Sequence, residues 1–132
     1  MSDKIGIQVR RSQLGRVRGT GSAHSGVHHW YVERLTAIAL VPLTLWFIFS
    51  MLRLAGAPQE AVANWGGSPI NAALLLALIV MTFHHMQLGI QVVLEDYINA
   101  KWLMNILILV NKAVAGLLGL IAAVAVIKLA LG

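Results

Sequence analysis

The sequence predicts an all-α membrane protein with three transmembrane helices. Of its 132 residues, 58% are hydrophobic and 11% are charged, whereas a soluble domain carries about 25% charged residues. Three apolar runs each exceed the roughly 20 residues that a helix needs to cross the ~30 Å hydrocarbon core. Only helices or closed barrels can cross lipid, and no alternating strand pattern occurs in the sequence. The chain is therefore expected to form a single small membrane domain.

A basic, polar arm comes first. Residues 1–27 are rich in Gly and Ser, a composition that provides no core. Half of the ten basic residues of the chain precede the first apolar run: Lys4, Arg10, Arg11, Arg16 and Arg18. That run, residues 35–54, is too long for a secretory signal and is predicted to be a retained helix. The arm is expected to contact anionic lipid or an acidic partner, and no nucleic-acid partner is expected.

The transmembrane domain is predicted to cover residues 28–132. Its three spans are expected over about 31–55, 71–97 and 103–131. Recurrent Gly and Pro predict a loop between the first two spans, and a short turn over 98–102 joins the last two. The arm and this turn carry basic residues, whereas the loop carries none. The arm and the turn should therefore face the cytoplasm, and the loop and the C-terminus the opposite side.

The second span carries two histidines at depth. His85 lies twelve residues before Tyr97, a rise of about 18 Å. If Tyr97 lies at the cytoplasmic interface, His85 lies near the middle of the bilayer, where ionisable residues are costly and usually functional. A neutral imidazole is a common metal ligand. Haem iron is the expected metal, because a porphyrin can itself be buried in an apolar bundle.

The spacing around His85 favours this interpretation. One helical face, at positions i, i+4, i+7 and i+11, carries His85, Gly89, Val92 and Asp96. Gly89 has no side chain, so a flat macrocycle can approach the backbone there. His84 projects about 100° away and cannot ligate the same iron from the other side. The second axial ligand is therefore expected from another chain. The alternative is that both histidines are polar groups that hydrogen-bond neighbouring helices.

Two further pairs of residues are candidates for binding. Tyr97 can be an ordinary interfacial tyrosine, or its phenol can donate a hydrogen bond to a quinone carbonyl oxygen while Asp96 accepts from the phenol or relays a proton. Arg34 can be an anchor at the membrane surface, or it can bind haem propionates together with His28. Lys112 lies about 16 Å into the third span and has no acidic partner within that span.

Two stretches of the chain resemble a known family. "SGVHHWYVERLTAIALVPL" and "HHMQLGIQVVLEDYI" are similar to the small cytochrome b membrane-anchor subunits of succinate dehydrogenase, the D-type anchors of respiratory complex II. The resemblance covers roughly residues 22–131. Its most specific element is a histidine, a glycine four residues later and then Asp-Tyr, here His85, Gly89, Asp96 and Tyr97. A second element comprises Gly26, Val27, His28, Arg34 and Thr36.

The resemblance implies a role for each candidate. His85 would be one axial ligand of haem b, and a histidine of a companion cytochrome b anchor subunit would be the other. Tyr97 would donate a hydrogen bond to ubiquinone, with Asp96 beside it. His28 and Arg34 would lie near the haem propionates. The chain would be a non-catalytic subunit in a bacterial or mitochondrial inner membrane, assembled with a flavoprotein subunit and an iron-sulfur subunit.

Two other functions stay open from the residues alone. The first is a small non-catalytic membrane protein, such as a transporter component or an assembly factor, in which His84 and His85 only pack. The second is a homodimeric cytochrome b, in which His85 from two copies holds one haem.

Overall fold

A computed structural model describes residues 24–132, and within that range all regular structure is helical. The helices are α2 (His24–Leu54), α3 (Gln59–Gly67), α4 (Pro69–Tyr97) and α5 (Lys101–Leu131). Three of them, α2, α4 and α5, contain segments long and apolar enough to cross a membrane, with mean hydropathies of 2.1, 1.7 and 2.5. The predicted all-α class with three membrane-spanning helices is confirmed.

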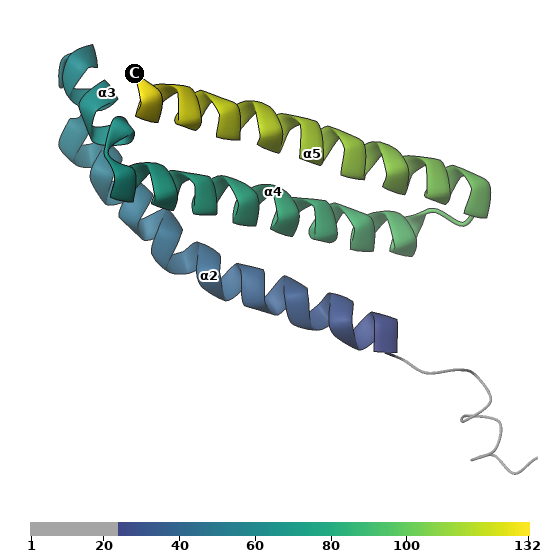
Figure 1. Cartoon of the computed structure of the whole chain (residues 1–132). Helices are drawn as coiled ribbons and strands as arrows, with labels where there is room; N and C mark the ends of the chain where they lie inside the picture. Colours follow the sequence, from purple (N-terminus) through teal and green to yellow (C-terminus); the bar gives the residue numbers. More distant parts are fainter. Residues whose placement is uncertain (1–23) are drawn as a thin grey trace, which may run out of the picture.

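The first long helix begins earlier than predicted. The sequence placed the start of the span near residue 31, whereas α2 begins at His24, inside the segment assigned to the arm. The first residues of α2, "HSGVHH", are polar, so hydropathy does not register them as part of a span. The remainder of the predicted arm, residues 1–23, lies outside the described residues. α2 also changes direction partway along its length (Figure 1), and Pro42 supplies a cause, because it has no N–H for the carbonyl of Ile38.

The connection between α2 and α4 contains a helix, and the prediction of a loop there was wrong. Gly56 ends α2 with φ of +78°, a conformation that glycine adopts without strain. Pro58 has extended backbone and begins α3. The Gly and Pro residues that predicted a loop thus mark helix ends, and the intervening "QEAVAN" has no helix breaker. Trp65 of α3 stacks on Trp46 of α2, with ring centroids 5.6 Å apart.

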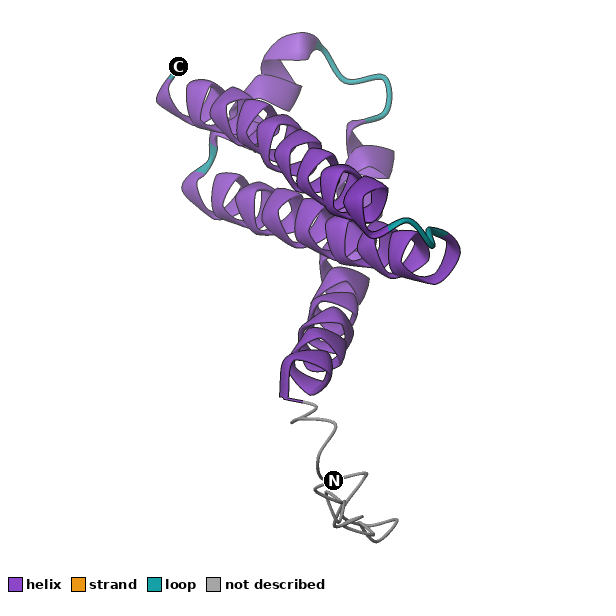
Figure 2. Cartoon of the chain, turned by 90° about the vertical axis from the view of Figure 1, so that its right-hand side faces the viewer, coloured by secondary structure: helices purple, strands orange, loops and turns teal. Residues whose placement is uncertain are grey.

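α4 lies between α2 and α5 and packs against both (Figures 1 and 2). The α4–α5 contact is close, because a Cβ added at Gly119 would lie 3.4 Å from the ring of Phe83. Ala115, one turn earlier on α5, is buried. One end of the bundle carries the start of α2, the end of α4 and the start of α5 (Figure 1), and we call it the arm end.

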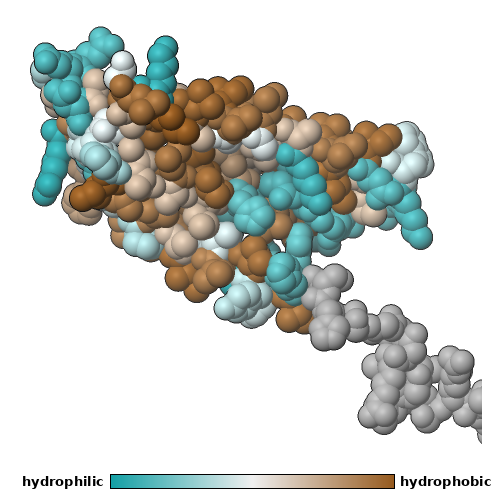
Figure 3. Space-filling view, viewed as in Figure 1, coloured by the Kyte–Doolittle hydropathy of each residue, from teal (hydrophilic) through white to brown (hydrophobic). Residues whose placement is uncertain are grey.

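The bundle buries few of its own side chains. Among the described residues the buried apolar side chains are Ala72, Leu88 and Ala115, and the buried polar ones are Thr36 and Gln87. Large apolar side chains are exposed along all three long helices, and they cover much of the visible face in Figure 3. A soluble monomer rarely exposes such a surface. Lipid or the helices of other subunits must therefore cover it.

Candidate functional site

His85 lies midway along α4 and faces α2. Its ring nitrogen Nδ1 is 3.0 Å from the Oγ1 atom of Thr36, a hydrogen bond that joins α4 to α2. The side chain of His85 is half-buried, and Thr36 is 5% exposed. Within the part of the chain that the structure describes, the other ring nitrogen, Nε2, makes no hydrogen bond.

The hydroxyl of Thr36 also contacts its own helix. Its Oγ1 atom is 2.9 Å from the carbonyl oxygen of Val32 and 2.9 Å from that of Glu33. Threonine in a helix commonly donates its hydroxyl proton to the carbonyl of the preceding turn. The oxygen of Thr36 is thus fixed by α2 at the position where it meets the imidazole of α4.

The surface next to His85 leaves room for a ligand. Gly89 follows His85 by one helical turn, and a Cβ added there would meet no atom within 4 Å. The backbone of α4 is therefore open at this position. The residues from 24 onward contain no cluster of three or more His, Asp or Glu side chains placed to hold a metal.

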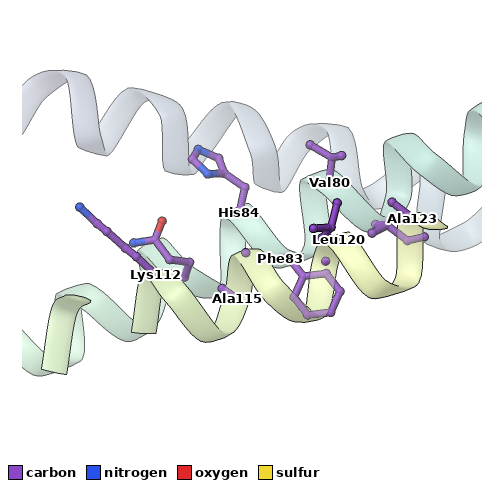
Figure 4. A pocket seen from close by; sticks show the side chains of 11 residues that line it. Val80, Phe83, His84, Lys112, Ala115, Leu120 and Ala123 are labelled. Carbon is purple, nitrogen blue, oxygen red and sulfur yellow. The ribbon is translucent and has the colours of Figure 1, made fainter. Parts of the chain in front are cut away.

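His84 points to a different neighbour. It lines an open cavity of about 420 Å³ between α4 and α5, together with Gln87 and Lys112 (Figure 4). His84 and Lys112 lie toward one end of this cavity, and Val80 and Leu120 lie toward the other end. The two adjacent histidines therefore face different helix pairs, in agreement with the predicted angle of about 100° between them.

His28 and Arg34 lie on α2 near the arm end, and both are exposed. The guanidinium carbon of Arg34 lies 5.8 Å from the centre of the Trp30 ring, within the range of a cation–π contact. Arg34 and Thr36 are two residues apart, about 200° around the helix, so Arg34 does not share the face that meets His85. The described part of the chain thus does not bring His28 and Arg34 together with His85.

A second open cavity, of about 460 Å³, lies between α2 and α4 on the arm-end side of His85. Polar side chains line it from both helices: His29 and Glu33 from α2, and Gln91 and Glu95 from α4. The sequence predicted no role for His29. His29 lies seven residues before Thr36 and therefore on the same helical face. This spacing could have indicated that His29 faces α4.

Asp96 and Tyr97 end α4 at the arm end, as predicted. Tyr97 is 79% exposed and Asp96 is exposed as well. A site built around these two side chains would therefore take its other walls from outside the described residues. Tyr97 follows His85 by twelve residues, so its backbone lies about 18 Å from that of His85 along α4.

The glutamines of α4 form a hydrogen-bonded row. Gln87 donates to Gln91 over 3.1 Å, and Gln91 donates to Glu95 over 2.8 Å. Asn111 of α5 donates to the backbone carbonyl of Gln87 over 2.9 Å. Polar side chains at depth in a membrane bond to one another because lipid offers no partner. The hydrogen bonds of the row therefore satisfy the polar side chains of α4 from the middle of the helix to its arm end.

Thr36 was missed as the partner of His85. In the sequence, Thr36 stands out only as part of a family motif, because a first span that starts near residue 31 gives Thr36 a shallow position. With α2 starting at His24, Thr36 lies twelve residues from the arm end. His85 lies twelve residues from Tyr97, the last residue of α4 at the same end. The equal depth of Thr36 and His85 on neighbouring helices could have identified their contact, but that depth can be calculated only when the start of α2 is known.

A family model and several known proteins match this chain, and their descriptions agree. Residues 8–127 match the family described as succinate dehydrogenase/fumarate reductase transmembrane subunit. The chain is 38% identical to the succinate dehydrogenase hydrophobic membrane anchor subunit of Rickettsia bellii, over 77% of this chain and 82% of that protein. It is 34% identical to the subunit of the same name from Rickettsia conorii, over 76% and 80%. The corresponding subunit of Paracoccus denitrificans is 30% identical over 60% and 61%. No solved structure matches the chain.

Proposed function

This chain belongs to the family of succinate dehydrogenase/fumarate reductase transmembrane subunits, as a membrane anchor subunit of succinate dehydrogenase, and we propose that it also binds haem b and helps to form the site of quinone reduction. Membership implies association with the other subunits of the complex. We propose that these are a flavoprotein that oxidises succinate to fumarate, an iron-sulfur subunit that carries the electrons, and a companion cytochrome b anchor.

The single observation that carries the haem proposal is the environment of His85. The imidazole is at mid-helix, one nitrogen is bonded within the chain, and the other makes no bond to the described residues. The open backbone at Gly89 provides space for a flat ring beside it. An imidazole with one free nitrogen next to such a space fits haem iron. Bound haem b would supply a one-electron store within the membrane.

The second axial ligand is proposed to come from the companion anchor. His84 is exposed, lines the cavity between α4 and α5, and lies about 100° around α4 from His85, so it is not placed to complete the coordination. His28 and Arg34 are exposed. They would hold the propionates, because the guanidinium of Arg34 can form paired hydrogen bonds with a carboxylate and the imidazole of His28 can supply a further donor.

Quinone reduction is proposed at the arm end, where Asp96 and Tyr97 lie. Succinate oxidation releases two electrons and two protons, and reduction of ubiquinone to the quinol consumes two of each. The phenol of Tyr97 can donate a hydrogen bond to a quinone carbonyl oxygen, and the carboxylate of Asp96 can accept a proton from water and pass it on. The exposure of both side chains supports a pocket shared with neighbouring subunits. This placement requires the arm end to face the cytoplasm, in a bacterial inner membrane.

Purification of the complex with its spectrum tests the proposal. We expect the chain to co-purify with three other subunits and to show the Soret and α bands of a low-spin haem b. A complex that reduces quinone but contains no haem would refute the haem assignment and leave the quinone assignment in place. A haem bound when this chain is expressed alone would indicate the homodimeric cytochrome b instead.

A further inference from the structure

We propose that Thr36 is a positioning residue for the haem ligand: its hydroxyl accepts a hydrogen bond from the Nδ1–H of His85 and thereby reserves Nε2 for the iron. This inference rests on the proposed haem ligation by His85. The residue that orients the imidazole of His85 is thus on α2, whereas His85 is on α4. The inference follows from the hydrogen bonds of the Oγ1 atom of Thr36.

The hydrogen-bond pattern at Thr36 determines which nitrogen of His85 carries the proton. The Oγ1 atom lies 2.9 Å from two carbonyl oxygens, those of Val32 and Glu33, and 3.0 Å from Nδ1. Carbonyl oxygens cannot donate, and a hydroxyl has only one proton. If that proton went to Nδ1, two pairs of oxygen atoms would face each other at 2.9 Å with no proton between them. The hydroxyl proton therefore goes to the carbonyls of α2, and Nδ1 of His85 is the donor.

This tautomer is the one that ligation of iron through Nε2 requires. In a neutral imidazole with the proton on Nδ1, the lone pair is on Nε2. Nε2 makes no hydrogen bond within the described residues, and Gly89 leaves open space beside the ring. Histidines that ligate metals almost always donate their other N–H to a neighbouring acceptor, which fixes the ring and makes the ligating nitrogen more basic. Thr36 supplies such an acceptor.

Burial protects this arrangement. Thr36 is 5% exposed, so water has little access to replace its hydroxyl as the acceptor. Thr36 and His85 each lie twelve residues from the arm end of their helix, a depth of about 18 Å. At that depth an unpaired N–H is costly, because lipid offers no acceptor. Without the hydroxyl, the ring of His85 has to rotate, change tautomer or leave its N–H unpaired.

Three variants in the full complex test the role of Thr36. Thr36→Val keeps the shape of the side chain and removes the acceptor, whereas Thr36→Ser keeps the acceptor. Thr44→Val is the matched control, because Thr44 is on the same helix but is exposed. The measurements are the haem content of each complex, the rate of haem loss to a scavenger, the midpoint potential of the haem and its low-spin electron paramagnetic resonance signal.

For Thr36→Val we expect haem to be held about 10- to 100-fold more weakly, the usual effect of losing such a partner. We also expect a higher midpoint potential, since a less basic ligand stabilises the oxidised iron less, and shifted g-values. Thr36→Ser and Thr44→Val should resemble the wild type. A Thr36→Val complex that matches the wild type in haem affinity, potential and g-values would overturn the inference.

A measurement on the wild-type complex keeps the inference testable if Thr36→Val fails to assemble. Electron–nuclear double resonance of the oxidised haem detects the proton on the non-ligating imidazole nitrogen. We expect a proton on Nδ1 of His85 that exchanges slowly in D₂O, as a buried hydrogen bond requires. A missing or rapidly exchanging proton would contradict the role of Thr36. A wild-type complex without haem would instead refute the proposed function on which the inference rests.

Discussion

Two adjacent histidines on α4 have different surroundings. His85 bonds to Thr36 of α2, whereas His84 lines the cavity between α4 and α5 with Lys112. The neighbours of each ring follow from the angle of about 100° between consecutive helical positions. Only His85 combines a bonded nitrogen, a nitrogen without a bond in the described region and open backbone beside it. The two residues should therefore respond differently to the same substitution.

We expect His85→Ala to remove the haem or to convert it to a high-spin form, because the substitution deletes the proposed ligand. His84→Ala should keep the low-spin spectrum, since its side chain faces the opposite helix pair. Absorption and electron paramagnetic resonance spectra of the purified complexes provide the measurement. The reverse pattern would make His84 the ligand.

A substitution can likewise distinguish the proposed role of Tyr97 in quinone reduction from a role in haem binding. Tyr97→Phe removes only the hydroxyl, and the residue lies about 18 Å along α4 from His85. We expect unchanged haem absorbance and quinone reduction slower by up to about tenfold, the equivalent of one hydrogen bond of roughly 1.4 kcal/mol. The assay is succinate-dependent quinone reduction, with succinate oxidation by an artificial acceptor as the control. Parallel loss of haem and of quinone reduction would show that Tyr97 is structural.

At the scale of the helices, the contact between α4 and α5 depends on small residues. A Cβ added at Gly119 would lie 3.4 Å from the ring of Phe83, whereas a Cβ added at Gly116 would meet no atom of the described residues within 4 Å. Both glycines lie in the same apolar helix, so their intrinsic effects on helix stability match. They form a matched pair for testing the packing of α5 on α4.

Gly119→Val should destabilise the bundle by about 1–3 kcal/mol through overpacking. Gly116→Val should have a smaller effect, because no atom of the described residues lies within 4 Å of the added Cβ. Thermal unfolding of the purified complex, followed by tryptophan fluorescence, measures the difference. Equal destabilisation by the two substitutions would mean that the contact with Phe83 does not control the packing.

The helices also show what hydropathy predicts and what it misses. The sequence identified all three long helices, because each contains an apolar run of sufficient length. It did not locate the polar start of α2 at His24, and it mistook α3 for a loop. Both segments lie beyond the apolar runs, where polar composition is compatible with helix or loop. Because the predicted start of the first span was too late in the sequence, the predicted depth of Thr36 was too small and its contact with His85 was not predicted.

At the scale of the whole molecule, the bundle is thin and its surface is apolar. The described residues bury three apolar side chains, Ala72, Leu88 and Ala115, while large apolar side chains remain exposed on every long helix. The open side of His85 and the exposed Tyr97 add to the surface that is incomplete without other subunits. The sequence predicted a partner because His85 needs a second ligand for the expected haem, but the partner's residues lie on another chain.

Expressed without its companion anchor, the chain should insert into membranes and show no low-spin haem, since the proposed site takes one ligand from His85 and the other from the companion. Co-expression with the companion should restore the low-spin spectrum. Membranes from the two strains can be compared by reduced-minus-oxidised difference spectra at equal levels of the chain. A low-spin haem in the first strain would show that two copies of His85 suffice.

The hydrogen bond between Thr36 and His85 has a consequence for biogenesis. It is made entirely within one polypeptide, so the ring can be oriented as soon as α2 and α4 pair in the bilayer. The rotational freedom of the imidazole is then lost during the folding of this subunit and not at the moment when the cofactor enters. An anchor waiting for its partner would already present a competent ligand, and cofactor capture would need only the arrival of the second polypeptide.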